Sequence, residues 1–378
     1  MTLALALVVL VPALQDDILP AGREHWEKPW VPDLGKDGAR VEIPAGNRID
    51  VVLLGDGYLA QERAQFEKDV RDWYERFLTY TPWSQFRGAF RVQGLWTPSE
   101  GRATPERKSH YRLPASSAGV GDVSSEDTRK AVFAALDRVA ANPAAARGRL
   151  THAVAVLLVR NEQGRNPSGM SRGVTSPDGK RSVSVAFAAY THHEFGHAYA
   201  GLRDEYIRGE GSRSNARAPE RPSLHTLTNL TYTKDPRQVP WAHLMPGSAA
   251  NPDRESVIGV LWLGGISEEG AWHSEARCLM NGTHENWDLA KSRRGANLRD
   301  MARFCFWCEE LAVARTLQKT GRLGPSEDGE ALWKKWAEEL RPLYHQAFDV
   351  PGRIRAKNAE NAKAKLAEAK IYERPGAP

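Results

Sequence analysis

The stretch His193-Glu194-Phe195-Gly196-His197 decides the fold that this sequence predicts. Histidines four residues apart lie on one face of an α-helix, one turn apart. Their imidazoles can then bind a single tetrahedral zinc ion. Glu194 follows the first histidine, so its carboxylate can take a proton from a water molecule at the open coordination position. The spacing therefore predicts a zinc site with His193 and His197 as ligands and Glu194 as general base.

A catalytic zinc ion needs a third protein ligand as well as an open position. Gly201 follows His197 by four residues and can end the helix by adopting a positive φ, which reverses the chain. Asp204 comes three residues later, and we predict that it is the third metal ligand. Glu205 is the second choice. The remaining alternatives are the distant histidines His243, His273 and His284.

The segments before this motif predict an α/β fold with a mainly parallel sheet. Residues 49–54, 89–95 and 152–159 are apolar enough for buried strands, and residues 60–78 and 124–141 have helical spacing between them. This alternation implies right-handed crossover connections. A turn signal at residues 177–180, between residues 169–175 and 183–188, predicts a hairpin at the sheet edge. The helix with the two histidines, residues 191–200, follows directly. His192 is expected to point off its metal-binding face.

The chain outside this region divides into segments of different composition. Residues 16–47 form an extended lead-in, and residues 48–320 are predicted to form the catalytic domain. Within that domain, residues 207–260 are irregular in pattern and a helix is expected over residues 298–320. Residues 321–378 are predicted to be a helical C-terminal extension and tail, with helices at 331–348 and 353–373. The C-terminal part is thus mainly helical or irregular.

The N-terminal apolar run predicts export. Residues 3–14 are almost wholly apolar but too few to span a bilayer as a helix. The length fits the apolar core of a signal peptide, which we place at residues 1–15. The alternative is a buried or mis-started N-terminus. We therefore expect a secreted or periplasmic protein without stable membrane association.

Composition argues against nucleic acid as a partner. The net charge is +5, and charged residues are interspersed through most of the chain rather than gathered in one patch. The 12 tryptophans are numerous for this length, and packing in the core is the preferred explanation over an aromatic groove. The expected partner is a protein or peptide substrate, and the oligomeric state is left open.

The three cysteines are Cys278, Cys305 and Cys308. An odd number leaves at least one of them unpaired within an exported monomer. The pair Cys305-Phe306-Trp307-Cys308 has redox or metal-ligand spacing, but a second such pair is absent, so a zinc ribbon is not expected. We predict a disulfide from Cys278 to Cys305 or Cys308.

Three motifs in order resemble the immunoglobulin A peptidase family of zinc metallopeptidases. The first is Leu54-Gly-Asp-Gly-Tyr58, followed by Glu62 and Phe66. The second runs from His193 to Tyr206, and the third combines Cys278-Leu-Met280 with Phe304-Cys-Phe-Trp-Cys308. The resemblance covers about residues 48–318, although the chain has no room before residue 48 for the β-sandwich domain that some relatives carry.

The resemblance implies a metzincin-like zincin fold with a mixed sheet, an active-site helix and Met280 in a turn beneath the metal. It implies a secreted zinc-dependent endopeptidase, and Tyr206, Tyr232 and His273 are candidate donors to the oxyanion. The immunoglobulin in the family's name is not taken as the substrate of this chain. Two alternatives remain, a secreted binding module that keeps the zincin scaffold and a zinc amidase acting on cell-wall peptides.

Overall fold

The computed structural model of the chain describes residues 17–21, 28–106, 108–113, 115–116, 119–120, 125–142, 152–162, 170–175, 182–187, 191–205, 223–264, 267–275, 278–281 and 303–372. The chain forms two compact units. The first comprises Met1–Pro32, Arg40–Leu202 and Arg315–Arg322, and the second comprises Asp33–Ala39, Arg203–Ala314 and Leu323–Pro378. The predicted signal peptide, the turn at residues 177–180, Tyr206 and His284 lie outside the described residues.

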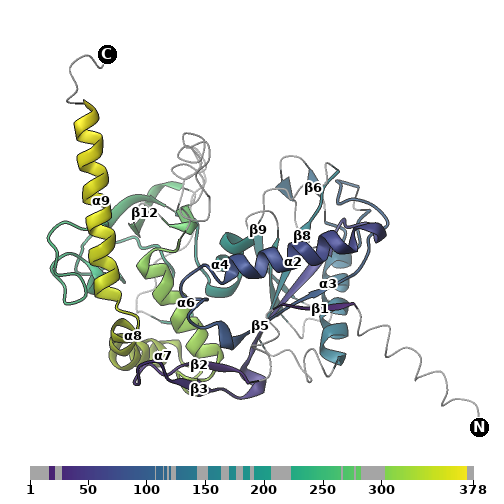
Figure 1. The fold of residues 1–378 in the computed structure, drawn as a ribbon, viewed down its shortest axis with the longest axis horizontal. Helices are drawn as coiled ribbons and strands as arrows, with labels where there is room; N and C mark the ends of the chain where they lie inside the picture. The colour runs from purple at the N-terminus through teal and green to yellow at the C-terminus, as the bar shows by residue number, and fades with distance from the viewer. Residues whose placement is uncertain are drawn as a thin grey trace, which may run out of the picture. The chain divides into compact units, whose positions relative to one another are not determined.

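The first unit is built around a mixed sheet of six strands in the order β1-β5-β4-β8-β10-β9 (Figure 1). The strands are β1 (Ile18–Ala21), β4 (Ile49–Asp56), β5 (Phe90–Leu95), β8 (His152–Val159), β9 (Met170–Thr175) and β10 (Ser182–Phe187). β5, β4, β8 and β10 run parallel to one another, whereas β1 and β9 are antiparallel to their neighbours. The predicted strands and edge hairpin are confirmed, while β1 was not predicted.

Helices α2 (Arg63–Phe77) and α3 (Glu126–Ala141) cover opposite faces of this sheet (Figure 1). Side chains alternate between the faces of a strand. Val52 and Leu54 of β4 are fully buried in one cluster with the apolar face of α3. On the other face, a Cβ placed on Gly94 of β5 would lie 2.7 Å from Val70, so glycine lets α2 approach closely. The Ser125 hydroxyl caps α3 by accepting from Thr128 N at 3.3 Å.

The helix predicted from the histidine motif is α4 (Thr191–Ala200). Three residues separate the end of β10 from its first residue, so the helix follows closely after the strand beside the edge strand β9. The shorter elements of this unit are η2 (Ala45–Asn47), η3 (Ala60–Glu62), η4 (Arg87–Ala89) and the two-stranded pairs β2 (Trp30–Pro32) with β3 (Arg40–Glu42) and β6 (Ala115–Ser116) with β7 (Gly119–Val120).

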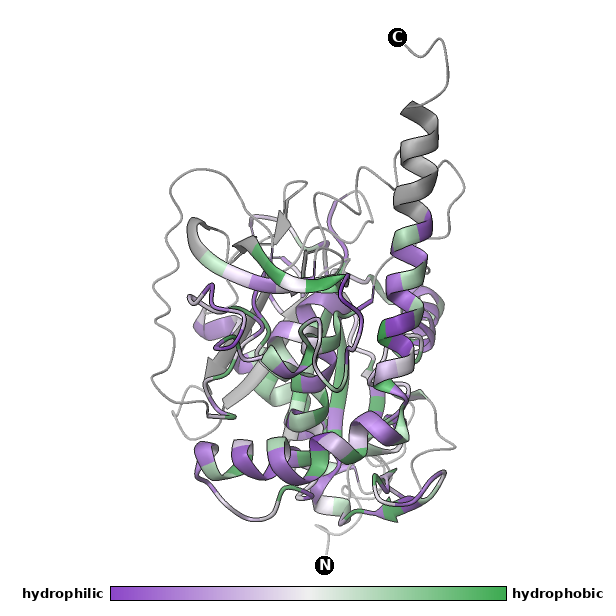
Figure 2. Cartoon of the chain, turned by 90° about the vertical axis from the view of Figure 1, so that its left-hand side faces the viewer, coloured by the Kyte–Doolittle hydropathy of each residue, from purple (hydrophilic) through white to green (hydrophobic). Residues whose placement is uncertain are grey.

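The second unit is mainly helical. Its helices are α6 (Phe306–Lys319, whose last five residues belong to the first unit), α7 (Gly329–Lys335), the π-helical turn Trp336–Leu340, α8 (Arg341–Ala347) and α9 (Val350–Tyr372). Polar residues predominate along the coloured part of α9 in Figure 2. The hairpin β11 (Ile258–Gly264) with β12 (Ser267–Glu275) and the 3-10 turns η5 (Ala242–Leu244) and η6 (Leu279–Asn281) complete this unit. The hairpin was not predicted.

Tryptophans fill the interior of both units. Trp83 in the first unit and Trp241, Trp307 and Trp336 in the second are fully buried. The preference for core packing is therefore confirmed at these positions. Among the described residues, no helix combines the length and apolarity that crossing a membrane requires.

Candidate metal centre

The two histidines of the motif meet on one face of α4, as their spacing predicts. His193 Nε2 and His197 Nε2 lie 3.1 Å apart. Two imidazole nitrogens bound to one tetrahedral zinc ion at about 2.0–2.1 Å would be about 3.3 Å apart. The pair therefore stands close to the separation that a shared zinc ion requires.

The protonation of His197 is set by the end of its own helix. His197 Nδ1 lies 2.7 Å from the Leu202 carbonyl oxygen, and a carbonyl only accepts, so Nδ1 carries the hydrogen. In a neutral imidazole the other nitrogen then holds a lone pair. That nitrogen, Nε2, is the one directed at His193. Metal-binding histidines commonly have their free nitrogen fixed in this way by a carbonyl or carboxylate.

Gly201 makes this geometry possible by ending α4. Its φ is +66°, in the left-handed region that favours glycine. Gly201 N donates to His197 O at 3.0 Å, and Leu202 N donates to Gly196 O at 3.4 Å. The first bond, from the glycine N–H to the carbonyl four residues before it, is that of the αL C-cap motif, which turns the chain back on the helix. The turn predicted at Gly201 is confirmed, and it is the same turn that brings the Leu202 carbonyl to His197.

The opposite face of α4 is fixed by aromatic packing. Phe195 is fully buried, and its ring centroid lies 4.9 Å from Trp83 and 5.7 Å from Phe77. His192 stacks on Trp73 at 4.6 Å and donates from Nε2 to the Trp73 carbonyl at 3.0 Å. Burial and the nearby positive charge of Arg76 lower the pKa of His192 to about 3, so it is neutral. His192 thus points off the metal-binding face, as predicted, and anchors the helix to α2.

Glu194 lies in the first turn of α4 and is 8% exposed. A carboxylate this sheltered from water suits a base that acts on a single bound molecule. Its role as general base stays a prediction.

The loop after Gly201 enters the second unit at Arg203, where hydrogen bonds fix its backbone. Asn229 receives the Arg203 N–H at 2.6 Å and returns a hydrogen bond to the Arg203 carbonyl at 2.9 Å. Glu205 N donates to the Met280 carbonyl at 2.9 Å. Asp204 is half-buried between these two fixed neighbours. Because Asp204 belongs to the second unit, its place as third ligand stays a prediction.

Glu205, the second choice for that ligand, has a different environment. Its side chain is 1% exposed, and its Oε1 lies 3.4 Å from Cys308 Sγ and 2.8 Å from Asn229 Nδ2. Burial raises the pKa of Glu205 well above its ordinary value. Glu205 is therefore committed to a group of cysteines inside the second unit, which argues against it as a ligand beside the histidines.

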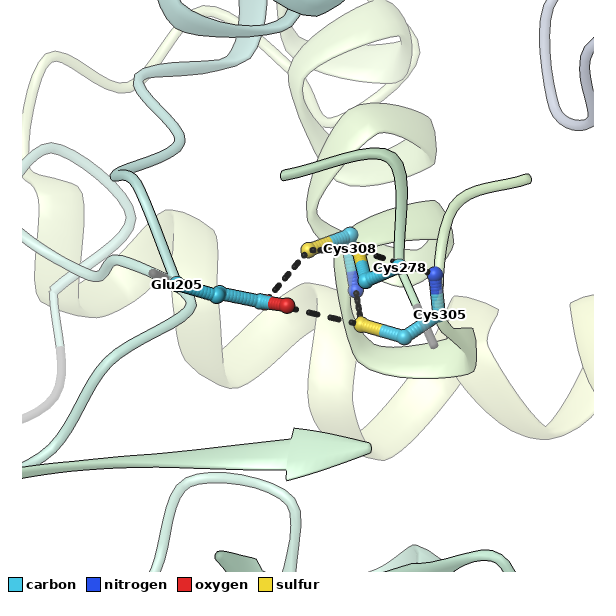
Figure 3. Close-up of side chains that lie close together, drawn as sticks. All are labelled: Glu205, Cys278, Cys305 and Cys308. Carbon is cyan, nitrogen blue, oxygen red and sulfur yellow. Dashed lines mark hydrogen bonds between the residues drawn. The ribbon is translucent and has the colours of Figure 1, made fainter. Parts of the chain in front are cut away.

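The predicted disulfide is wrong in this structure. Cys278, Cys305 and Cys308 are all free and buried, and the Cys278 and Cys308 sulfur atoms are 3.7 Å apart (Figure 3). A disulfide bond would bring them to about 2.05 Å. The cysteines gather around Glu205 instead. Sequence reasoning noticed the metal-ligand spacing of Cys305 and Cys308 but did not connect it with Glu205.

The distant histidines have partners within the second unit. His243 Nε2 and His345 Nε2 lie 2.8 Å and 2.6 Å from the two carboxylate oxygens of Glu310. Burial by itself would raise the pKa of Glu310, but these two histidines lower it to about 2. His273 Nδ1 donates to the Glu275 carbonyl at 2.9 Å. His243 thus belongs to a group with Glu310 and His345, separate from the histidine motif, whose ligand atoms lie close enough together to hold a metal ion. Met280 lies in the 3-10 turn η6, as predicted, and is fully buried, while its position beneath the metal stays a prediction.

The motif around Asp56 at the end of β4 is structural. Its carboxylate accepts from Tyr111 N at 2.7 Å, Ser109 Oγ at 2.8 Å and Leu113 N at 3.2 Å, so it fixes the backbone of that loop. Burial raises the pKa of Asp56 to about 6 against the hydrogen bonds that favour its charged form.

Comparison with known proteins agrees with the geometry. A model of the IgA Peptidase M64 family matches residues 40–254, which include β4, the whole of α4 and Asp204. No curated protein matches the chain.

Proposed function

The chain belongs to the IgA Peptidase M64 family and is therefore a metallopeptidase; from this premise we propose that it is a secreted endopeptidase that uses one zinc ion. The observation that carries the choice of metal and site is the hydrogen bond from His197 Nδ1 to the Leu202 carbonyl. It directs the Nε2 lone pair of His197 toward His193 Nε2, 3.1 Å away. Neutral imidazoles at this separation suit zinc.

Asp204 is our proposed third ligand. Gly201 turns the chain immediately before it, and the neighbouring residues Arg203 and Glu205 are fixed by Asn229 and by the Met280 carbonyl. Glu205 faces the cysteines, so Asp204 is the carboxylate of this segment without a role in that group. A zinc ion bound by His193, His197 and Asp204 would polarise the scissile carbonyl and make the attacking water more acidic.

The remaining steps belong to the side chains and backbone of the protein. Glu194 accepts the proton of the attacking water and returns it to the leaving amine. Its carboxylate is largely sheltered from bulk water, because Glu194 is only 8% exposed. Among the described strands, β9 lies at the end of the sheet, so its outer backbone edge can pair with an extended peptide. Strand pairing recognises backbone rather than side chains, which fits an enzyme that cleaves within a chain.

Incubation of the full chain with a reduced, unfolded protein tests this proposal. We expect internal cleavage that stops after dialysis against a chelator and returns when zinc is added. Internal cleavage appears in the masses of the fragments. A protein that binds zinc but leaves the unfolded substrate intact would contradict the proposal and favour a binding module.

A further inference from the structure

Four potential metal ligands converge inside the second unit. The carboxylate of Glu205 and the sulfur atoms of Cys278, Cys305 and Cys308 offer ligand atoms that all lie within 4.8 Å of one another. Every one of these side chains is at most 2% exposed. They come from three separate segments, namely the loop after α4, the residue before η6 and the start of α6 (Figure 3). Cysteine thiols are often buried, but a buried carboxylate needs a compensating partner.

The separations match a tetrahedral zinc ion. Zinc–sulfur bonds of about 2.3 Å place two thiolate sulfurs about 3.8 Å apart, and a carboxylate oxygen about 3.6 Å from each sulfur. The Cys278 and Cys308 sulfurs are 3.7 Å apart. Glu205 Oε1 lies 3.4 Å from Cys308 Sγ and 3.9 Å from Cys305 Sγ. Each measured edge is thus within about 0.3 Å of the tetrahedral value.

Hydrogen-bond donors from the backbone and from Ser274 surround two of the sulfur atoms, those of Cys278 and Cys305. Cys278 Sγ accepts from Met280 N at 3.4 Å and from Cys305 N at 3.3 Å. Cys305 Sγ accepts from Cys308 N at 3.4 Å and from the Ser274 hydroxyl at 3.3 Å. Hydrogen bonds to sulfur and a position at the start of a helix both favour the thiolate over the thiol. Thiolates in turn select zinc over harder cations.

A buried oxygen of Glu205 points to the same conclusion. Glu205 Oε2 has no hydrogen-bond partner although it is excluded from water. His273 Nδ1 lies 3.9 Å from this oxygen and donates to the Glu275 carbonyl instead. An unsatisfied buried carboxylate oxygen is costly. A cation among the sulfur atoms would offset that cost.

We propose that Glu205, Cys278, Cys305 and Cys308 form a second, structural zinc site. The site has four protein ligands and no open position, as structural zinc sites do, so it would not take part in hydrolysis. It would tie the loop with Asp204 to η6 and to the first turn of α6. The group of His243, Glu310 and His345 differs from this site, because it offers three ligands rather than four and both of its histidines are partly exposed.

This site is independent of the proposed function, and its test separates the two. The full chain is expressed in zinc-supplemented medium, and metal is measured by mass spectrometry after dialysis without a chelator. We expect about two zinc ions per chain in the wild type and about one in the double variant His193→Ala, His197→Ala. A wild type with only one zinc ion, which the double histidine variant keeps, would contradict the proposed function and leave the cysteine site standing.

Two further variants localise the remaining zinc ion. Cys308→Ser or Glu205→Ala, each in the background of the double histidine variant, should reduce it to well below one per chain. Glu275→Gln is the matched control, because Glu275 is also buried in this unit but has partners on both oxygens, Phe306 N and Lys357 Nζ. It should keep the zinc ion. Loss of zinc from the control and not from the Glu205 variant would overturn the proposal.

The double histidine variant with intact cysteines covers the case in which cysteine variants do not fold. Reconstituted with Co2+ alone, it should show the near-ultraviolet charge-transfer absorption of cobalt–thiolate bonds. Thiol titration of the denatured wild type after zinc removal should find three free thiols. Absence of the cobalt–thiolate absorption, or a disulfide between Cys278 and Cys308, would overturn the proposal.

Discussion

Replacement of Gly201 tests whether the end of α4 controls zinc binding. Gly201 has φ +66°, and a Cβ added there would meet no atom within 4 Å. The cost of Gly201→Ala is therefore backbone strain without a clash. The left-handed region costs a non-glycine residue about 1–2 kcal/mol, and the reduced freedom of the unfolded chain returns about 0.4–1 kcal/mol. We expect a net loss of about 1 kcal/mol in the free energy of unfolding.

Gly38 provides a matched control. It lies in the exposed loop between β2 and β3, with φ +65° and again no atom within 4 Å of an added Cβ. Gly38→Ala should thus cost the same stability as Gly201→Ala. Only Gly201 lies beside the carbonyl that holds the Nδ1 hydrogen of His197. Disturbing a partner of this kind typically lowers metal affinity by about 10- to 100-fold.

Two measurements separate the effects. Urea unfolding in the presence of a chelator gives the stability of each metal-free variant, and competition with a coloured chelator gives its zinc affinity. We expect equal losses of stability and a loss of zinc affinity in the Gly201 variant alone. Gly201→Val, which strains the same φ further, should enlarge that loss. Wild-type zinc affinity in both Gly201 variants would refute the reasoning.

Three other predictions concern Asp204, Asp56 and the N-terminus. Asp204→Ala should lose zinc from the histidine site as well as activity. Asp204→His should recover part of both, because imidazole is also a good zinc ligand. Full zinc content in Asp204→Ala, measured by metal analysis, would rule Asp204 out as the third ligand. Asp56→Asn should cost about 1–3 kcal/mol, because the amide turns one buried acceptor into a donor. The exposed Asp127, paired with Arg112, should tolerate the same change with little effect in urea unfolding. The pKa of Asp56 is raised from 3.8 to about 6, so its contribution to stability is fully present below pH 3.8 and is lost as pH rises through about 6. The difference in free energy of unfolding between wild type and Asp56→Asn should therefore shrink from pH 5 to pH 7.5. A difference that widens would be contrary evidence. N-terminal sequencing of exported protein should find a first residue between about 14 and 20, and retention of Met1 would remove the argument for export.

The elements that the sequence predicts correctly carry their own local signal. The apolar runs of β4 and β8 are long and continuous, as strands buried on both faces require. The spacing of His193 and His197, and the glycine that ends α4, depend only on residues within one short segment. Such features follow from the local sequence and do not require long-range contacts.

The features that were missed depend on distant partners. β1 is four residues long and contains a proline, and only its pairing with β5 makes it a strand. The β11–β12 hairpin has irregular register between Ile258 and Leu261 and again between Trp262 and Gly264, which hides the alternation of side chains that marks a strand. Neither could be read from local pattern alone.

The choice between Asp204 and Glu205 shows the same limit within the site. The two carboxylates are adjacent, and spacing after Gly201 slightly favours the first. The structure separates them because Glu205 is drawn into the group formed by Cys278, Cys305 and Cys308, which lie more than 70 residues further along the chain. No sequence pattern near Glu205 indicates that these cysteines are its partners.

Zinc content and peptidase activity of Glu194→Ala, measured on the same preparation, test the central claim most directly. Glu194 is assigned as the base that takes the proton of the attacking water, and the histidines beside it hold the metal. We predict that the variant keeps the zinc content of the wild type and loses hydrolysis of the unfolded protein substrate. Loss of zinc from the variant, or full activity with zinc retained, would contradict the account.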